Sequence, residues 1–140
     1  KAWKISIFAR LLEGERAYAM LSDLMTKKLY GNLWTTHPPF QIDCNFGYPA
    51  GVNEMLVQSH MGYVHLLPAL PKAWADGSVK GMRVRGGFEL DMDWKDGKLI
   101  KAVLRGISNR SEKVDVRYNN KTRKIAVAKD NSVIIKADNL

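Results

Sequence analysis

The spacing of the apolar residues changes near residue 63, and this change constrains the fold of the 140-residue chain more than any other feature. Before it, apolar residues recur every three or four positions, which is the period of a helix. After it, apolar and polar residues alternate, which is the period of a β-strand. Helices followed by strands predict an α+β chain. The length suits one ordinary domain, or one small domain with part of another.

The first half predicts a helical hairpin. Trp3, Ile7 and Leu11 are spaced four apart and define one apolar face of a short helix. A second stripe runs through residues 17–25, and Gly14 lies in the break between the two. Stripes at this spacing are typical of packing faces.

Proline limits the structure of the segment that follows. Pro38-Pro39 disfavours helix, so residues 32–47 are predicted to be irregular. A third helix is predicted from about Pro49 to Ser59, with the proline near its first position. The irregular segment therefore ends close to a helix N-terminus, where backbone N–H groups are unpaired.

The second half predicts five or six short antiparallel strands, most simply in a sandwich. Asp96-Gly97 is a hairpin turn, and Arg85-Gly86-Gly87 is a bend or bulge between strands. The clearest alternation runs through residues 88–94. The predicted strands lie at residues 82–85, 88–94, 100–105, 114–118, 125–127 and 133–135.

The basic residues are concentrated in the strand-rich half. The chain has 22 basic and 14 acidic residues, a net charge of +8, and residues 71–140 account for +7 of it (16 basic minus 9 acidic). Most of this excess falls on polar strand positions or in turns, which favours a solvated face over nucleic-acid binding. We expect acidic residues of 88–94 to face Lys101 and Arg105 across the hairpin. The apolar stretches are too short for a transmembrane helix, so no membrane partner is expected.

The chain offers few residues for metal or cofactor chemistry. Three histidines and one cysteine have no metal-binding spacing, so neither a metal nor a cofactor is expected. Acidic residues at every second position of 88–94 are more typical of a wet strand face than of a calcium site. Trp74, Trp94 and Tyr118 could form a sugar-stacking platform, although such residues on an alternating face usually belong to the core.

The segment from His37 to Gly47 is the main candidate for chemistry. It places an imidazole, two side-chain amides (Gln41 and Asn45) and the carboxylate of Asp43 in one irregular stretch. Because flanking apolar residues should partly bury Asp43, neighbouring groups are expected to hold it. The alternative is that Asp43 only caps the following helix.

Long motifs in the chain resemble the C-terminal portion of glycoside hydrolase family 95, which contains inverting α-L-fucosidases acting on α-1,2-linked fucose. The resemblance covers about residues 1–105. It rests on WKISIFARLLEGERAY, HPPFQIDCNFG, AGVNEMLVQSH and HLLPALPKAWADGSVKGMRVRGGFELDMDWKDGKL.

The resemblance implies the last helices of an (α/α)6 barrel followed by a C-terminal antiparallel β-sandwich-type domain. Residues 1–62 then supply the last helices and the active-site loop, residues 63–78 a connector, and residues 79–140 the β-domain. The start at Lys1, without a methionine, is what a piece of a larger enzyme would show. Such enzymes are commonly exported to the periplasm or the cell exterior, and this chain carries no signal-peptide pattern.

The resemblance also implies roles for individual residues. Asp43 matches the aspartate that orients and polarises an asparagine amide in contact with the attacking water. His37, Gln41 and Asn45 are assigned to substrate binding, with the latter two shaping the loop. The general acid Glu and the asparagine pair lie upstream, so the fragment is expected to be inactive alone. The implied partners are a fucosylated oligosaccharide or polysaccharide and the upstream barrel.

Two readings of the function stay open beside the fucosidase. Cys44 stands where glycine is usual in the family, and Tyr48-Pro49 where small residues are usual. An α-L-galactosidase specificity within the same family is therefore an alternative. The other is a carbohydrate-binding or structural β-module without catalysis.

Overall fold

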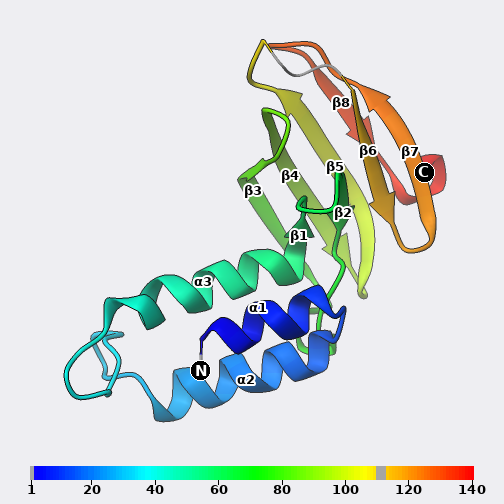
Figure 1. The fold of residues 1–140 in the computed structure, drawn as a ribbon. Helices are drawn as coiled ribbons and strands as arrows, with labels where there is room; N and C mark the ends of the chain where they lie inside the picture. Colours follow the sequence, from blue (N-terminus) through cyan, green and yellow to red (C-terminus); the bar gives the residue numbers. More distant parts are fainter. Residues whose placement is uncertain (1, 110–112) are drawn as a thin grey trace. The chain divides into compact units, whose positions relative to one another are not determined.

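The computed structural model describes residues 2–109 and 113–140, and the chain divides into two compact units (Figure 1). The helical unit comprises residues 1–56 and 68–71, and the β-unit comprises residues 57–67 and 72–140. Helices in one unit and strands in the other confirm the α+β class. The predicted helical start at Lys1 lies outside the described residues.

Three helices form the helical unit: α1 (Trp3–Arg10), α2 (Gly14–Lys27) and α3 (Ile42–Leu56). The first two confirm the predicted hairpin. In α1, however, the buried residues are Ile5 and Ala9, whereas the predicted face of Trp3, Ile7 and Leu11 is exposed. The largest apolar stripe of this helix is therefore not covered by the described part of the chain.

Helix α3 is longer than predicted, and Pro49 lies in its interior at the eighth position. A proline there removes one backbone hydrogen bond and disfavours the helix. Packing against α1 opposes this cost, because Gly51 lets the two helices approach closely. A Cβ on Gly51 would lie 2.5 Å from Cγ2 of Ile5. The prediction that the helix begins near Pro49 is thus wrong, and tertiary contact is the reason.

The β-unit contains two four-stranded sheets, ordered β1-β2-β6-β7 and β3-β4-β5-β8. All six predicted strands are confirmed, and Asp96 and Gly97 form the predicted turn with φ of 50° and 70°. The short strands β1 and β2 were not predicted. The strands are β1 (Val57–Gln58), β2 (Tyr63–Leu66), β3 (Gly77–Val84), β4 (Phe88–Lys95), β5 (Lys98–Gly106), β6 (Lys113–Tyr118), β7 (Lys121–Ala126) and β8 (Ser132–Ile135), with short 3-10 helices at Lys72–Trp74 and Ala137–Asn139.

One strand pair corrects the prediction of an antiparallel domain. Strand β2 pairs with β6 in parallel, with Val64 opposite Val116, and every other pair of named strands is antiparallel among the described residues. The two partners are about fifty residues apart in the chain, so they are not joined by a tight turn. A parallel pair requires a long crossover of this kind.

The core of the β-unit lies between the two sheets. Strand β4 alternates as predicted, burying Phe88, Leu90, Met92 and Trp94. The Trp94 indole Nε1–H donates to the Trp74 carbonyl at 2.8 Å. The Tyr118 hydroxyl accepts the Leu99 N–H from the other sheet at 2.9 Å. Trp94 and Tyr118 therefore belong to the core and are not a sugar-stacking platform.

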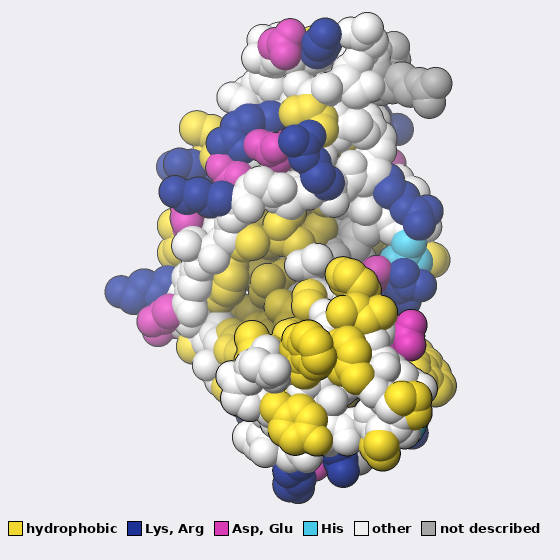
Figure 2. Space-filling view, turned by 90° about the vertical axis from the view of Figure 1, so that its left-hand side faces the viewer, with side chains coloured by type: hydrophobic (Ala, Val, Ile, Leu, Met, Phe, Trp, Pro, Cys, Tyr) yellow, Lys and Arg dark blue, Asp and Glu magenta, His cyan; other side chains and the backbone are white. Residues whose placement is uncertain are grey.

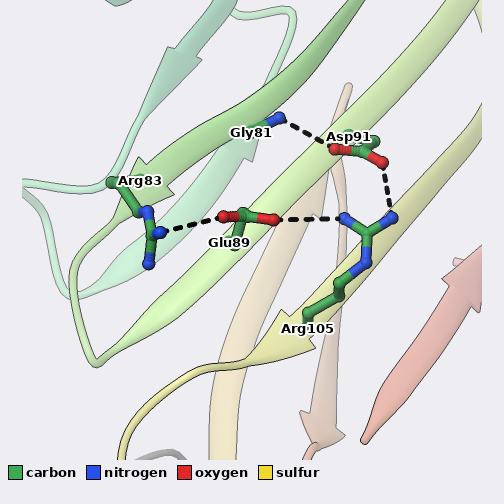
Figure 3. A network of polar contacts seen from close by, with 5 residues as sticks. All are labelled: Gly81, Arg83, Glu89, Asp91 and Arg105. Carbon is green, nitrogen blue, oxygen red and sulfur yellow. Dashed lines mark hydrogen bonds and ion pairs between the residues drawn. The ribbon is translucent and has the colours of Figure 1, made fainter. Parts of the chain in front are cut away.

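The outer face of β3, β4 and β5 carries a network of ion pairs (Figure 3). Arg105 lies opposite Glu89, as expected across the hairpin, and its guanidinium also contacts the Asp91 carboxylate. Glu89 in turn pairs with Arg83 at 3.1 Å, and Asp91 accepts the Gly81 N–H at 2.9 Å. Gly81 has φ of +71° where the register of β3 shifts, a conformation that favours glycine. These acidic residues thus brace the sheet from its wet side.

Candidate active-site loop

The segment between α2 and α3, residues 28–41, is folded back on itself and is called the site loop below. A backbone bridge joins Leu29 to Thr35, and the Thr36 N–H donates to the Lys28 carbonyl at 2.9 Å. The Asn32 side chain accepts the Trp34 N–H at 3.1 Å, which closes the tip of the turn. The loop is therefore ordered by its own hydrogen bonds, as its irregular sequence requires.

Two side chains tie the site loop to the start of α3. The Asn45 Nδ2 group donates to the Leu33 carbonyl at 2.8 Å. Thr35 is buried, and its hydroxyl donates to the Gln41 carbonyl at 3.4 Å. The Oδ1 atom of Asn45 is buried and has no hydrogen-bond partner among the described residues. Asn45 thus positions the loop through its amide nitrogen.

Asp43 lies in the first turn of α3 and is exposed. None of the described residues forms a hydrogen bond or ion pair with its carboxylate. The expectation that neighbours bury and hold Asp43 is therefore wrong for this part of the chain, because the helix begins at Ile42 and directs the residue outward. Asp43 is also not the residue that precedes the helix, so it does not occupy the N-cap position. Its charge still interacts favourably with the positive end of the helix dipole.

The other predicted site residues lie on the same loop. His37 is exposed, and its Nδ1 lies 3.5 Å from the Pro39 carbonyl oxygen. Gln41 immediately precedes α3 and is also exposed. Asn45 and Asp43 share the first turns of α3. The four residues are therefore collected at one end of the helical unit, although no hydrogen bond joins Asp43 to the other three.

Glu54 is not a partner acid for Asp43. It is eleven residues further along the same helix, which corresponds to about 16 Å of helix rise. An inverting pair of carboxylates is separated by about 6.5–9.5 Å. Glu54 also receives Arg10 Nη2 and Nε at 2.9 and 3.2 Å. The geometry agrees with the sequence motif in leaving Glu54 a structural residue.

An aromatic pair at the site loop was missed by the sequence analysis. Trp34 and Phe40 stack with ring centroids 4.5 Å apart, and both rings are exposed. Phe46, in α3, is 72% exposed. Figure 2 shows hydrophobic side chains gathered over the helical unit in the lower part of the view. Six-residue spacing in an irregular stretch has no period that could have revealed the stacking.

The remaining titratable groups give no second centre in the described residues. Burial raises the pKa of the Cys44 thiol, so this half-buried cysteine is not an activated nucleophile. Burial, with a smaller contribution from Arg117, lowers the pKa of His65, which is a buried histidine of the β-unit. No group of three metal-ligating side chains occurs in residues 2–109 and 113–140. No helix of those residues has the length and apolarity to cross a membrane.

Comparison with known families decides the class of the protein. Residues 1–56 match the glycosyl hydrolase family 95 catalytic domain, and residues 58–139 match the glycoside hydrolase family 95 C-terminal domain. The chain belongs to glycoside hydrolase family 95. The two family 95 matches meet where helix α3 ends and strand β1 begins.

Curated members of family 95 are similar along most of this chain. Alpha-L-fucosidase 2 of Arabidopsis thaliana is 41% identical over 134 aligned positions, which cover 79% of this chain and 16% of the relative. Probable alpha-fucosidase A of Aspergillus oryzae is 37% identical, covering 83% and 18%. Its counterpart in Aspergillus niger is 31% identical, covering 81% and 16%. The chain thus spans less than a fifth of the length of these relatives.

Proposed function

We propose that this chain is the C-terminal part of an inverting α-L-fucosidase that removes terminal α-L-fucose from oligosaccharides or polysaccharides. The observation that carries the proposal is the pair of adjoining family 95 matches, one to a catalytic and one to a C-terminal domain. The names of the relatives, all fucosidases, supply the substrate class. Residues 1–62 are the last helices and active-site loop, residues 63–78 the connector and residues 79–140 the β-domain.

The exposed apolar face of the helical unit supports completion by upstream helices of an (α/α)6 barrel. Trp3 and Leu11 are 62% and 60% exposed, and Ile7 between them is 41% exposed. Single exposed apolar residues are ordinary, but a stripe along one helix indicates a contact surface. The upstream helices of the proposed barrel would cover this stripe and extend toward the site loop.

In the proposed mechanism an upstream glutamic acid protonates the glycosidic oxygen while water attacks the anomeric carbon from the opposite face. Asp43 accepts a hydrogen bond from the asparagine amide that contacts this water. An amide is a weak base, and a neighbouring carboxylate increases its ability to draw the water proton. The exposed carboxylate of Asp43, with no partner in the described chain, is available for such a contact.

The stereochemistry of the product tests the proposed reaction. The complete enzyme should release fucose from an α-1,2-linked fucosyl oligosaccharide first as the β-anomer, followed by proton NMR before mutarotation. Initial release of the α-anomer would contradict inversion. The matching α-L-galactoside serves as the comparison substrate, and faster release of galactose would reassign the sugar.

A further inference from the structure

A pocket of about 430 Å³ opens in the β-unit, formed by residues on both sheets. Its walls come from the β1–β2 turn, the β3–β4 turn and the adjoining ends of β6 and β7. Pockets of this size are large enough for a small ligand. All the lining residues belong to the β-unit, so the pocket does not involve the site loop.

The floor of the pocket is apolar. Val64 and Phe88 are each 1% exposed, and Val114 is half-buried. The half-buried Tyr63 lines the same pocket and presents an aromatic ring. An apolar floor with an aromatic wall suits the C–H face of a sugar ring, which excludes water from the same surface.

The rim of the pocket is cationic. Arg85, Lys113 and Lys124 line it, and all three are exposed. Asp115 is the one carboxylate among the described lining residues, and it lies 3.9 Å from Lys124. Within the described chain, Arg85 and Lys113 form no ion pair. The rim therefore carries two positive charges that no neighbouring carboxylate offsets.

Hydroxyl groups complete the polar side of the pocket. The Ser59 Oγ accepts the Arg85 backbone N–H at 3.2 Å, and Ser59 keeps its own hydroxyl hydrogen for donation. The Tyr63 hydroxyl accepts from Arg117 Nη1 at 3.4 Å. Both groups are held in place by these contacts, so they are arranged before any ligand arrives.

We propose that this pocket binds an anionic saccharide unit, with the sugar ring on the apolar floor and its negative group at Arg85 and Lys113. A uronate carboxylate and a sulfate ester share this chemistry. Simple solvation accounts for scattered lysines on strand faces, but not for cations set around a concave, apolar floor. The inference rests on the proposed function only in taking the ligand to be a glycan.

The binding test uses the 140-residue chain labelled with ¹⁵N and titrated with three oligosaccharides of equal length: one uronate-containing, one sulfated and one neutral. An anionic oligosaccharide should shift the amide resonances of Ser59, Gly62 and Gly86, which line the pocket. The same titration with inorganic phosphate measures binding of a free anion. Equal affinity for the neutral oligosaccharide, or phosphate binding as tight as the anionic sugar, would overturn the proposal.

Charge variants locate the interaction. Arg85→Gln and Lys113→Gln should each weaken binding by about tenfold, because each removes a charge-assisted contact. Lys121→Gln removes the same charge from strand β7 outside the pocket and should change affinity by less than about twofold. All three positions are exposed, so the variants should fold, and their circular dichroism spectra check this. Equal weakening by all three would show nonspecific attraction to a basic chain.

This experiment separates the failure of the pocket from the failure of the fucosidase proposal. Binding is measured without hydrolysis, on a chain that lacks the proposed general acid. An active α-L-fucosidase whose β-unit binds none of the saccharides would overturn only the pocket. A β-unit that binds an anionic saccharide in a protein without fucosidase activity would overturn only the proposed function.

Discussion

The Asn45 side chain joins the site loop to helix α3 through one short hydrogen bond. Asn45→Ala should lower the free energy of unfolding by about 1 kcal/mol, because the Leu33 carbonyl loses its donor. Asn53→Ala is the matched control, since Asn53 is an exposed residue of the same helix and gains the same helix propensity. Urea unfolding of both variants measures the difference. Equal stability of the two would show that the bond does not hold the loop.

Individual residues also show how far the sequence could predict the site. The motif placed Asp43, His37, Gln41 and Asn45 correctly on one loop and the helix that follows it. It could not predict that Asp43 is exposed, because this depends on where α3 begins. Periodicity sets that start at Pro49, whereas packing against α1 moves it to Ile42. Local signals are thus least reliable where tertiary contact decides an element's boundary.

The contact between α1 and α3 depends on the absence of a side chain at Gly51. Gly51→Ala gains up to about 1 kcal/mol in helix propensity. Overpacking against Ile5, whose Cγ2 would lie 2.5 Å from the new Cβ, should cost about 1–3 kcal/mol. A net loss of stability is therefore expected in thermal unfolding. Gly31→Ala is the control, because a Cβ there meets no atom within 4 Å. A more stable Gly51→Ala chain would contradict the close packing.

The ion-pair network on β3, β4 and β5 should make the stability of the β-unit depend on pH. The hydrogen bond from Arg105, with that from the Gly81 N–H, holds the pKa of Asp91 below its ordinary value of 3.8. A depressed folded-state pKa stabilises the fold above the ordinary value, and this contribution is lost as the pH falls through the folded pKa. Unfolding temperatures measured from pH 7 down to pH 2 should therefore drop below about pH 4.

Two variants test the source of this acid sensitivity. Asp91→Asn should lower the unfolding temperature at pH 7 by roughly a few degrees and flatten its acid dependence. Asp93→Asn is the control on the same strand, because Asp93 is exposed and outside the network. An unchanged acid dependence in Asp91→Asn would assign the effect to other carboxylates.

At the level of elements, alternation predicted six strands of the β-unit because each presents one face to the core. It failed for β1 and β2 for two reasons. Strand β1 has two residues, too few to show a period. Strand β2 is mostly buried and gains its partner β6 from about fifty residues away, so no local turn signal marks the pairing. Long-range parallel pairing is the part of this fold that one sequence does not reveal.

For the whole molecule, the exposed stripe of α1 should make the isolated chain associate. Burial of such a stripe is worth about 25 cal/mol per Å² of apolar surface. Sedimentation velocity should therefore show a concentration-dependent increase in mass, and Trp3→Ser with Leu11→Ser should reduce it. Ile134→Ser, at an exposed position of strand β8, is the control and should leave association unchanged. A monomer at every concentration would weaken the argument that upstream helices cover this stripe.

The central claim is that this chain supplies Asp43 to an active site completed by upstream residues, and the turnover number of the complete enzyme tests it most directly. Asp43→Asn should reduce kcat on an α-1,2-linked fucosyl oligosaccharide by about 100-fold or more, with little change in KM, because the lost contact acts in the transition state. Asp23→Asn, which removes a surface carboxylate paired with Lys27, should leave kcat unchanged. A wild-type kcat in Asp43→Asn, or fucose release by the 140-residue chain alone, would contradict the claim.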